Sequence, residues 1–305
     1  MSDIKLFHIQ GSKAVSLPGS AFKLELELQS VVEHHMDVLL QMRFVAAEHS
    51  TGKNHGGRID TLGLDENGCP VIIEYKRNIN ANVINQGLFY LDWLMDHKAD
   101  FEMLVLKKYG QKVVDTIDWT GPRLLCIAED YTKYDVHAVQ QINRNIDLIQ
   151  YIHYPDGFLV LNLVNAVTAP PIPEDDLQKK PGKPKTEYKT IHDSMAQMTD
   201  RMQTVYNEAR EFMVELGEDV QEKELKYYIA FRRLKNFATI QYLPTKEELI
   251  FFLNIDPDTV VLEKGFSVDV RKIGHQGTGN LELQIHSLED LEKAKPLIQR
   301  SFEEN

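Results

Sequence analysis

The chain has 305 residues, enough for two domains that each bury a core of their own. Its formal net charge of −12 argues against a protein that coats nucleic acid non-specifically, although a local basic groove stays compatible with that charge. The two cysteines, Cys69 and Cys126, form no metal-binding pattern and fit a reducing cytoplasm as packing residues. No segment resembles a signal peptide or reaches the roughly 18 apolar residues of a membrane helix. We therefore expect a cytoplasmic protein without a membrane partner.

Helical and strand-like patterns alternate along residues 1–168, which we interpret as the first domain. This alternation predicts an α/β fold, an αβ sandwich around a mixed sheet. The expected elements are a helix over 22–42, an edge strand ending near Glu48, strands around Asp60 and Glu74, helices over 82–97 and 101–110, a strand over 122–129, a helix over 135–145, and strands over 146–154 and 158–164.

Residues 169–190 are rich in proline and charge and poor in large apolar side chains, which predicts a linker between two independently folded units. The second domain, 191–305, is expected to be a small α+β accessory domain. Its expected elements are a long helix over 191–216, strands over 225–233, 237–243 and 249–255, and a closing helix over 288–304.

A hairpin turn in the first domain determines which charged residues share a face of the sheet. Asp65-Glu66-Asn67-Gly68 is typical of a type I turn followed by a left-handed residue, here Gly68. Directly opposed residues, and alternate residues along a strand, lie on one face. The expected cross-strand pairs are Asp65 with Cys69, Leu62 with Ile72, Asp60 with Glu74 and Arg58 with Lys76.

This register predicts two carboxylates, Asp60 and Glu74, beside the ammonium group of Lys76. Opposed like charges destabilise a sheet, but a divalent cation between them would reverse the sign of that effect. Lys76 would then hold a water molecule or offset charge that develops on a phosphate. The pattern indicates metal-assisted phosphodiester hydrolysis. The alternative is a surface hairpin in which Asp60 pairs with Arg58 or Lys76.

At these residues the sequence resembles the PD-(D/E)XK nuclease superfamily: Asp60 is followed, after thirteen residues, by Glu74-Tyr75-Lys76. Ile59 stands where the motif name has proline. The segment Gln86 to Tyr90, "QGLFY", resembles the QxxxY motif of RecB-like members, and residues four apart share a helix face. The whole first domain is similar to the NucS-like subgroup. The second resembles a small domain of unknown function that often follows such nuclease folds.

The resemblance implies a restriction-endonuclease-like fold and a metal-dependent DNA endonuclease with a repair or restriction role. It implies Mg²⁺ as cofactor, replaceable by Mn²⁺, a partner that is DNA, with RNA as the alternative, and a homodimer. The alternative is a non-catalytic module that binds nucleic acid or protein. The implied catalytic residues are Asp60, Glu74, Lys76, Gln86, Tyr90 and Glu25, with Glu33 as runner-up for Glu25 and Glu48 as a weaker candidate. The implied metal ligands are Asp60, Glu74 and the Tyr75 carbonyl.

Two further segments have ordinary interpretations. The glycine-rich segment 273–283 lacks the spacing and lysine of a phosphate-binding loop, so we expect it to connect strands. Segment 223–242 interleaves basic and aromatic residues. That pattern can grip single-stranded nucleic acid, but aromatic side chains in strands belong more often to a core.

Overall fold

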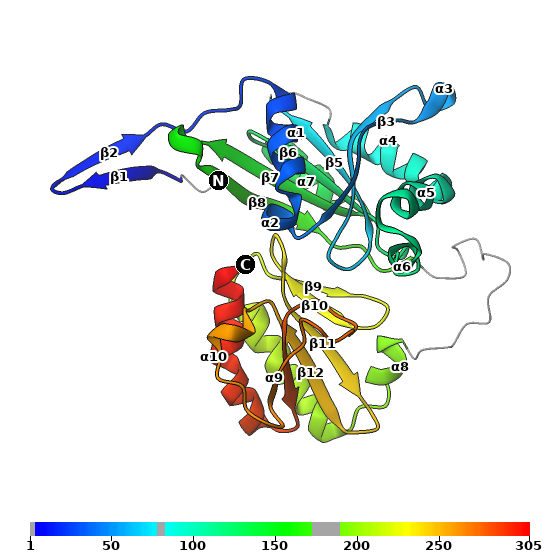
Figure 1. Cartoon of the computed structure of the whole chain (residues 1–305), viewed down its shortest axis with the longest axis vertical. Coiled ribbons are helices and arrows are strands. Elements are labelled where there is room, and N and C mark those ends of the chain that lie inside the picture. The colour runs from blue at the N-terminus through cyan, green and yellow to red at the C-terminus, as the bar shows by residue number, and fades with distance from the viewer. Residues whose placement is uncertain (1–3, 78–82, 173–189) are drawn as a thin grey trace. The chain divides into compact units, whose positions relative to one another are not determined.

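The computed structural model describes residues 4–77, 83–172 and 190–305. Its contacts divide the chain into two compact units, Met1–Ala169 and Pro170–Asn305, each of which is described by itself (Figure 1). Unit 1 ends one residue after the expected domain end at 168, whereas unit 2 begins at Pro170 and not at 191. Most of the expected linker, residues 173–189, lies outside the described residues.

Unit 1 is built around a six-stranded mixed sheet with the strand order β3-β4-β5-β6-β7-β8. The strands β5, β6 and β7 run parallel, and the other neighbours pair antiparallel. The expected mixed sheet within an α/β arrangement is therefore present. The strands are β3 (Arg43–Ser50), β4 (Arg58–Leu64), β5 (Pro70–Lys76), β6 (Arg123–Ala128), β7 (Asn145–His153) and β8 (Leu159–Val167).

Helices lie on both faces of this sheet. Gly87 of α4 packs so closely on Leu124 that an added Cβ would lie 2.4 Å from that side chain. Leu124 is in register with Ile72, which is in register with Leu62, so these three residues face α4. Gly63, the next residue after Leu62, faces the opposite side of the sheet. Met36 of α2 lies against Gly63, so α2 covers that opposite side. The helices are α1 (Glu25–His34), α2 (Met36–Leu40), α3 (Gly52–His55), α4 (Val83–Asp96), α5 (Lys98–Tyr109), α6 (Gln111–Val114) and α7 (Lys133–Gln140).

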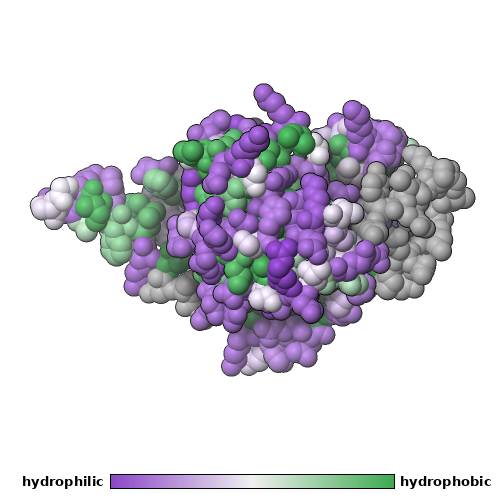
Figure 2. Space-filling model, turned by 90° about the horizontal axis from the view of Figure 1, so that it is seen from below, coloured by the Kyte–Doolittle hydropathy of each residue, from purple (hydrophilic) through white to green (hydrophobic). Residues whose placement is uncertain are grey.

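Unit 1 differs from the expectation in several places: α3 and α6 were not expected, and α7 ends at Gln140 although a helix was expected over 135–145. The helix over 22–42 is two helices, because His35 between α1 and α2 leaves helical geometry at φ −116° and ψ 22°. A hairpin of β1 (Leu6–Gln10) and β2 (Lys13–Leu17), which was not expected, forms a separate two-stranded sheet (Figure 1). Figure 2 shows apolar side chains, in green, on this projecting hairpin.

Unit 2 is an antiparallel six-stranded sheet, in the order β13-β14-β12-β11-β10-β9, with three α-helices among its described residues. Its aromatic residues Tyr228, Phe231 and Phe237 are buried, as expected of a core. The strands are β9 (Gln221–Glu224), β10 (Ile229–Arg232), β11 (Asn236–Leu243), β12 (Glu248–Leu253), β13 (Ser267–Asp269) and β14 (Leu281–Ile285); the helices are α8 (Ile191–Met195), α9 (Asp200–Glu215) and α10 (Leu288–Glu304).

The long helix expected over 191–216 is wrong in one respect: α8 and α9 are separate. Thr199 has extended dihedral angles, and its side chain accepts a hydrogen bond from the Met202 N–H at 3.5 Å. A threonine in this position caps the start of a new helix. The strands β9, β13 and β14 were not expected, whereas most of the glycine-rich segment does connect strands. Across the described ranges, no helix has the length and hydropathy needed to cross a membrane.

Candidate active site at the ends of β4 and β5

The turn between β4 and β5 confirms the predicted register as far as Thr61 and Ile73, whereas the expected pairs Asp60 with Glu74 and Arg58 with Lys76 lie beyond the end of the backbone ladder. The Asp65 carboxylate accepts hydrogen bonds from the N–H groups of Asn67 and Cys69 at 2.9 and 2.8 Å. Gly68 has a φ of +80°, which only glycine adopts without strain. Leu62 consequently lies opposite Ile72, as expected.

The backbone ladder between β4 and β5 ends at the pair Thr61 and Ile73. Beyond that pair, side chains replace the backbone as acceptors. The N–H of Asp60 donates to Oε1 of Glu74 at 3.3 Å, and the N–H of Tyr75 donates to Oδ2 of Asp60 at 3.1 Å. Each carboxylate thus reaches across to the backbone of the other strand, and the two acidic side chains are brought together.

Burial makes both carboxyl groups hard to ionise. Glu74 is fully buried, and this burial, together with the charge of nearby Asp60, raises the pKa of Glu74 to about 9. Burial also raises the pKa of Asp60, although the Tyr75 N–H partly offsets the effect. Oε2 of Glu74 is buried and has no hydrogen-bond partner among the described residues. An unsatisfied buried oxygen of this kind costs free energy unless something else coordinates it.

Lys76 is the cation that acts most directly on this pair. Its charge lowers the pKa of both Asp60 and Glu74, while its Nζ pairs with Oε2 of Glu25 at 3.2 Å. Arg58 pairs with Glu48 at 2.5 Å instead of with Asp60. The surface-hairpin alternative, in which Asp60 pairs with Arg58 or Lys76, is therefore not the arrangement that the structure shows.

A glutamine that the sequence pattern did not single out connects the acidic residues. Nε2 of Gln29 lies within hydrogen-bond distance of three acceptors, Oε1 of Glu33 at 3.0 Å, Oε1 of Glu48 at 3.1 Å and the carbonyl of Asp60 at 3.0 Å, which its two N–H groups share. Glu25, Gln29 and Glu33 are spaced by four residues and share one face of α1. That spacing was the signal that could have identified Gln29.

Glu48, the weaker candidate, also lies at the site. It is a non-glycine residue at φ +53° within β3, a strained conformation for an L-amino acid. Its two oxygens bind Gln29 and Arg58, and its charge raises the pKa of both Asp60 and Glu74. Strain of this kind persists where surrounding contacts enforce it, which is common at functional sites.

The motif residues Gln86 and Tyr90 hold the start of β4. The Tyr90 hydroxyl accepts hydrogen bonds from Nε2 of Gln86 at 3.2 Å and from the N–H of Arg58 at 3.1 Å. An added Cβ on Gly57 would lie 2.5 Å from the Tyr90 ring, so this close approach needs glycine. The contacts seen in the described residues therefore lead from the motif to the backbone two residues before Asp60, and not to the carboxylates themselves.

Tyr75 contributes its backbone. Its side chain is buried, and its N–H is directed at Asp60. A residue in an extended strand directs its N–H and C=O toward the same neighbouring strand. The Tyr75 carbonyl is thus directed to the side where the β4 ladder has ended. Within the described ranges, no group of three or more His, Cys, Asp or Glu side chains is placed to hold a metal ion.

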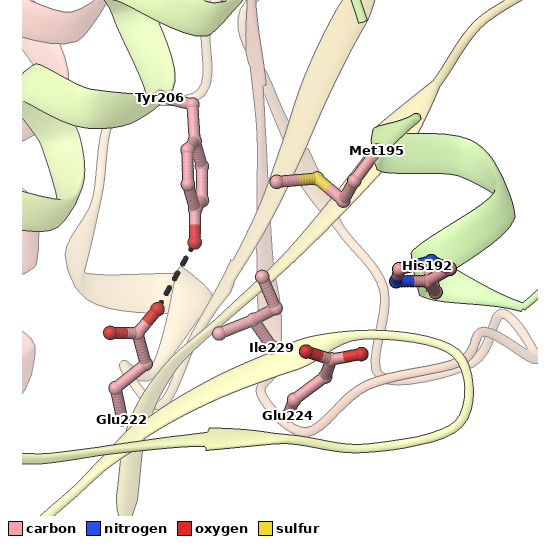
Figure 3. A pocket seen from close by; sticks show the side chains of 6 residues that line it. All are labelled: His192, Met195, Tyr206, Glu222, Glu224 and Ile229. Carbon is pink, nitrogen blue, oxygen red and sulfur yellow. Dashed lines mark hydrogen bonds between the residues drawn. The ribbon is translucent and has the colours of Figure 1, made fainter. Parts of the chain in front are cut away.

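Unit 2 has a pocket of about 320 Å³ that the sequence pattern did not indicate (Figure 3). Glu222 accepts from the Tyr206 hydroxyl at 3.1 Å and from Arg210 at 2.7 Å, so its charge is already compensated. The residues that line the pocket are His192, Met195, Tyr206, Glu222, Glu224 and Ile229.

Comparison with known proteins adds two similarities. The family model described as "Domain of unknown function (DUF5655)" matches residues 191–305, the range of the second expected domain. A protein of Haemophilus influenzae, described as "Uncharacterized protein", is 27% identical over 313 residues, which cover 99% of this chain and all of that relative. The similarity to this relative therefore runs through both units. No solved structure matches the chain.

Proposed function

We propose that unit 1 is a restriction-endonuclease-like domain of PD-(D/E)XK type that hydrolyses phosphodiester bonds in DNA with Mg²⁺. One observation carries the proposal. Asp60 and Glu74 cross between two strands beside Lys76, and a buried oxygen of Glu74 has no protein partner among the described residues. A divalent cation bound at this site would coordinate that oxygen and offset the negative charge of the two carboxylates.

The donor atoms suit such a cation. Mg²⁺ binds hard oxygen ligands and typically takes one or two carboxylates, completing its shell with waters and substrate phosphate oxygens. Asp60 and Glu74 supply the carboxylates, and the direction of the Tyr75 carbonyl adds a third oxygen on the same side. Bound there, the cation would act as a Lewis acid toward the phosphate.

The residues around the carboxylates have separable roles in this proposal. Lys76 orients the attacking water and offsets charge that develops on the phosphate. Glu25 positions Lys76 through their 3.2 Å ion pair. Gln86 and Tyr90 act as positioning residues, because their hydrogen bonds hold the backbone that leads to Asp60.

The arrangement of the sheet also supports the proposal. The two acidic residues lie where an antiparallel pair separates, and β5 continues into the parallel set β5-β6-β7. Helix α4, which carries Gln86, packs on the same face as Leu62 and Ile72. This arrangement supports the proposal because it brings α4 and the acidic pair to the same region of the sheet.

The alternative is a non-catalytic binding module, and one observation favours it. A pKa of about 9 leaves Glu74 protonated at neutral pH when no cation is present, so the acidic pair can persist without metal. Metal binding and cleavage decide between the two functions.

The experiment titrates Mg²⁺ and Mn²⁺ into the protein by calorimetry and assays cleavage of duplex DNA, single-stranded DNA and RNA. Wild type is expected to bind the metal and cut DNA, whereas Glu74→Gln loses most of both. Asp92→Asn, which removes one exposed carboxylate of α4, is the matched control and should behave as wild type. Wild type that neither binds metal nor cuts any of the substrates would establish the binding-module alternative.

A further inference from the structure

The β1–β2 hairpin is a ribbon without a core. It belongs to neither six-stranded sheet, and every residue from Leu6 to Leu17 is exposed except those two ends. Gly11 at φ +60° starts its two-residue turn, the arrangement of a type II′ hairpin. An isolated two-stranded hairpin is at best marginally stable in water. Such a ribbon gains stability when a partner covers it.

The side chains of the ribbon differ between its two faces. Phe7 and Ile9 lie on one face and are 50% and 64% exposed. The other face carries His8, Lys13 and Val15, because directly paired residues point the same way. One face is therefore mainly apolar, and the other mixes apolar side chains with the polar and basic ones.

The charge of this segment is opposite to that of the chain. Acidic residues make up 46 of the 305 residues, yet none occurs between Ile4 and Lys23. The same stretch contains three lysines, Lys5, Lys13 and Lys23. A basic segment in an acidic protein indicates a partner that carries negative charge.

The base of the ribbon is fixed beside the candidate active site. The Tyr154 hydroxyl donates to the Ile4 carbonyl at 3.2 Å, and Ser20 pairs with His153, so both ends are held at the end of β7. The carboxyl ends of the parallel strands β5 and β7 lie at one edge of the sheet. Arg77, the residue after Lys76, donates to the Lys23 carbonyl at 2.8 Å. The ribbon therefore starts at the edge that carries Lys76.

We propose that the β1–β2 hairpin is a DNA-binding arm that lies in a groove of the duplex whose phosphate occupies the site of Asp60, Glu74 and Lys76. This inference rests on the proposed function. The major groove admits a two-stranded β-ribbon. With five residues per strand the ribbon is about 17 Å long, at roughly 3.4 Å per residue. Its lysines contact phosphates, and its apolar face contacts base edges.

The other candidate partner is the arm of a second copy of the chain, which would complement this surface less well than DNA does. A contact between the apolar faces of two arms would cover Phe7, Ile9, Ala14 and Ser16 and leave Lys13 on the outer face of each arm, where no acidic residue of either arm could pair with it. The geometry therefore favours DNA, and self-association becomes an outcome of the test.

The test measures binding of a fluorescent DNA duplex, about three helical turns long, by anisotropy in EDTA to prevent cleavage, over a range of NaCl concentrations. The double variant Lys5→Ala/Lys13→Ala should bind about tenfold more weakly. The slope of log K against log salt should fall by about 2, because each phosphate that a lysine neutralises contributes roughly 0.9. Lys264→Ala/Lys272→Ala, which removes two exposed lysines of unit 2, is the matched control and should keep the wild-type slope. Circular dichroism and thermal melting check that all variants fold.

A second variant tests the apolar face. Phe7→Ser/Ile9→Ser should weaken duplex binding several-fold and leave the salt slope unchanged. If this variant instead converts a dimer to a monomer in analytical ultracentrifugation, with DNA binding intact, the arm is a self-association surface and the proposal is wrong. Arm variants that bind DNA as wild type does, or a wild type that binds no DNA, overturn it equally.

The arm and the nuclease activity can fail separately. Binding that depends on the arm, combined with no cleavage in Mg²⁺, would support the arm and overturn the proposed function. Metal-dependent cleavage that is unaffected by the arm variants would support the proposed function and overturn the role of the arm.

Discussion

The backbone N–H of Asp60 donates a hydrogen bond to the carboxylate of Glu74 at 3.3 Å, at the point where β4 and β5 separate. Among the described residues, this contact satisfies Oε1 of Glu74 and leaves the buried Oε2 without a partner. The acidic pair is therefore sensitive to pH and to any cation that can replace the missing partner.

The pH dependence of stability should reveal Glu74 in the metal-free protein. Its pKa is about 9 in the folded chain and near 4.5 when unfolded, so the folded state holds an extra proton between these values. As far as Glu74 determines it, the free energy of unfolding is then greatest below pH 4.5 and falls as pH rises toward 9, by up to about 1.4 kcal/mol per pH unit. Urea unfolding in EDTA across this pH range measures the slope. Glu74→Gln should flatten it; an equally steep slope in that variant would contradict the prediction.

Lys76→Ala should separate chemistry from metal binding. Removing a group that stabilises charge in the transition state typically lowers the rate on the order of 10²–10³-fold. Lys76 is not a ligand in the proposal, so calorimetry should show Mg²⁺ affinity within a few-fold of wild type. Glu25→Gln keeps the lysine and removes only its partner, which predicts a smaller loss of rate. A Lys76→Ala protein that cleaves DNA normally would refute the role given to this residue.

Tyr90→Phe should loosen the start of β4. The substitution removes the acceptor of the part-buried Arg58 N–H, and the loss of one such hydrogen bond typically costs about 0.5–1.5 kcal/mol. Tyr134→Phe on the exposed surface of α7 is the control and should not change the unfolding midpoint. Gly57→Ala should destabilise as well, because its Cβ would lie 2.5 Å from the Tyr90 ring. Chemical denaturation of the three variants tests this arrangement.

A buried ion cluster at the other end of the sheet should affect folding and not the metal site. Arg123 is buried, its guanidinium lies 3.2 Å from the carboxylate of Asp65, and it also contacts Asp147. Burial by itself lowers the pKa of Arg123, but the nearby acidic residues outweigh that effect and raise the pKa. Arg123→Met would leave the buried carboxylates of Asp65 and Asp147 without their cation, which costs about 3–5 kcal/mol of the free energy of unfolding. The expected result is a large drop in melting temperature with unchanged Mg²⁺ affinity. Arg271→Met, at a surface cluster, should change the midpoint far less.

Residues 191–305 should fold without unit 1. They have their own buried core and lie wholly within unit 2, which begins at Pro170. The isolated fragment is expected to unfold in one cooperative transition. Thr199→Ala should lower its stability by about 1 kcal/mol through loss of the α9 cap, whereas Thr204→Ala inside α9 serves as the comparison. A fragment without cooperative unfolding would show that the unit depends on the rest of the chain.

Local sequence determined much of unit 1. The register of β4 and β5 follows from Asp65 and Gly68, since a turn type fixes which residues oppose each other within a hairpin. The same local rule predicts that Asp60 and Glu74 meet, and the two do contact each other across the strands. The end of α5 at Gly110 and the turn at Pro155 to Gly157 were also predictable, because glycine and proline mark helix ends and turns within the local sequence.

Only the tertiary structure decided the partners and the burial of these residues. Glu25 is 51 positions from Lys76 along the chain, and Gln29 is 31 from Asp60, so no pattern within a strand or helix could pair them. The strain at Glu48 and the pKa of Glu74 likewise depend on what packs around each side chain. Turns and registers follow from neighbours in sequence, whereas burial and charge compensation follow from neighbours in space. The amino-acid sequence therefore determined which acidic residues meet, and the fold decided how each is held and how readily it ionises.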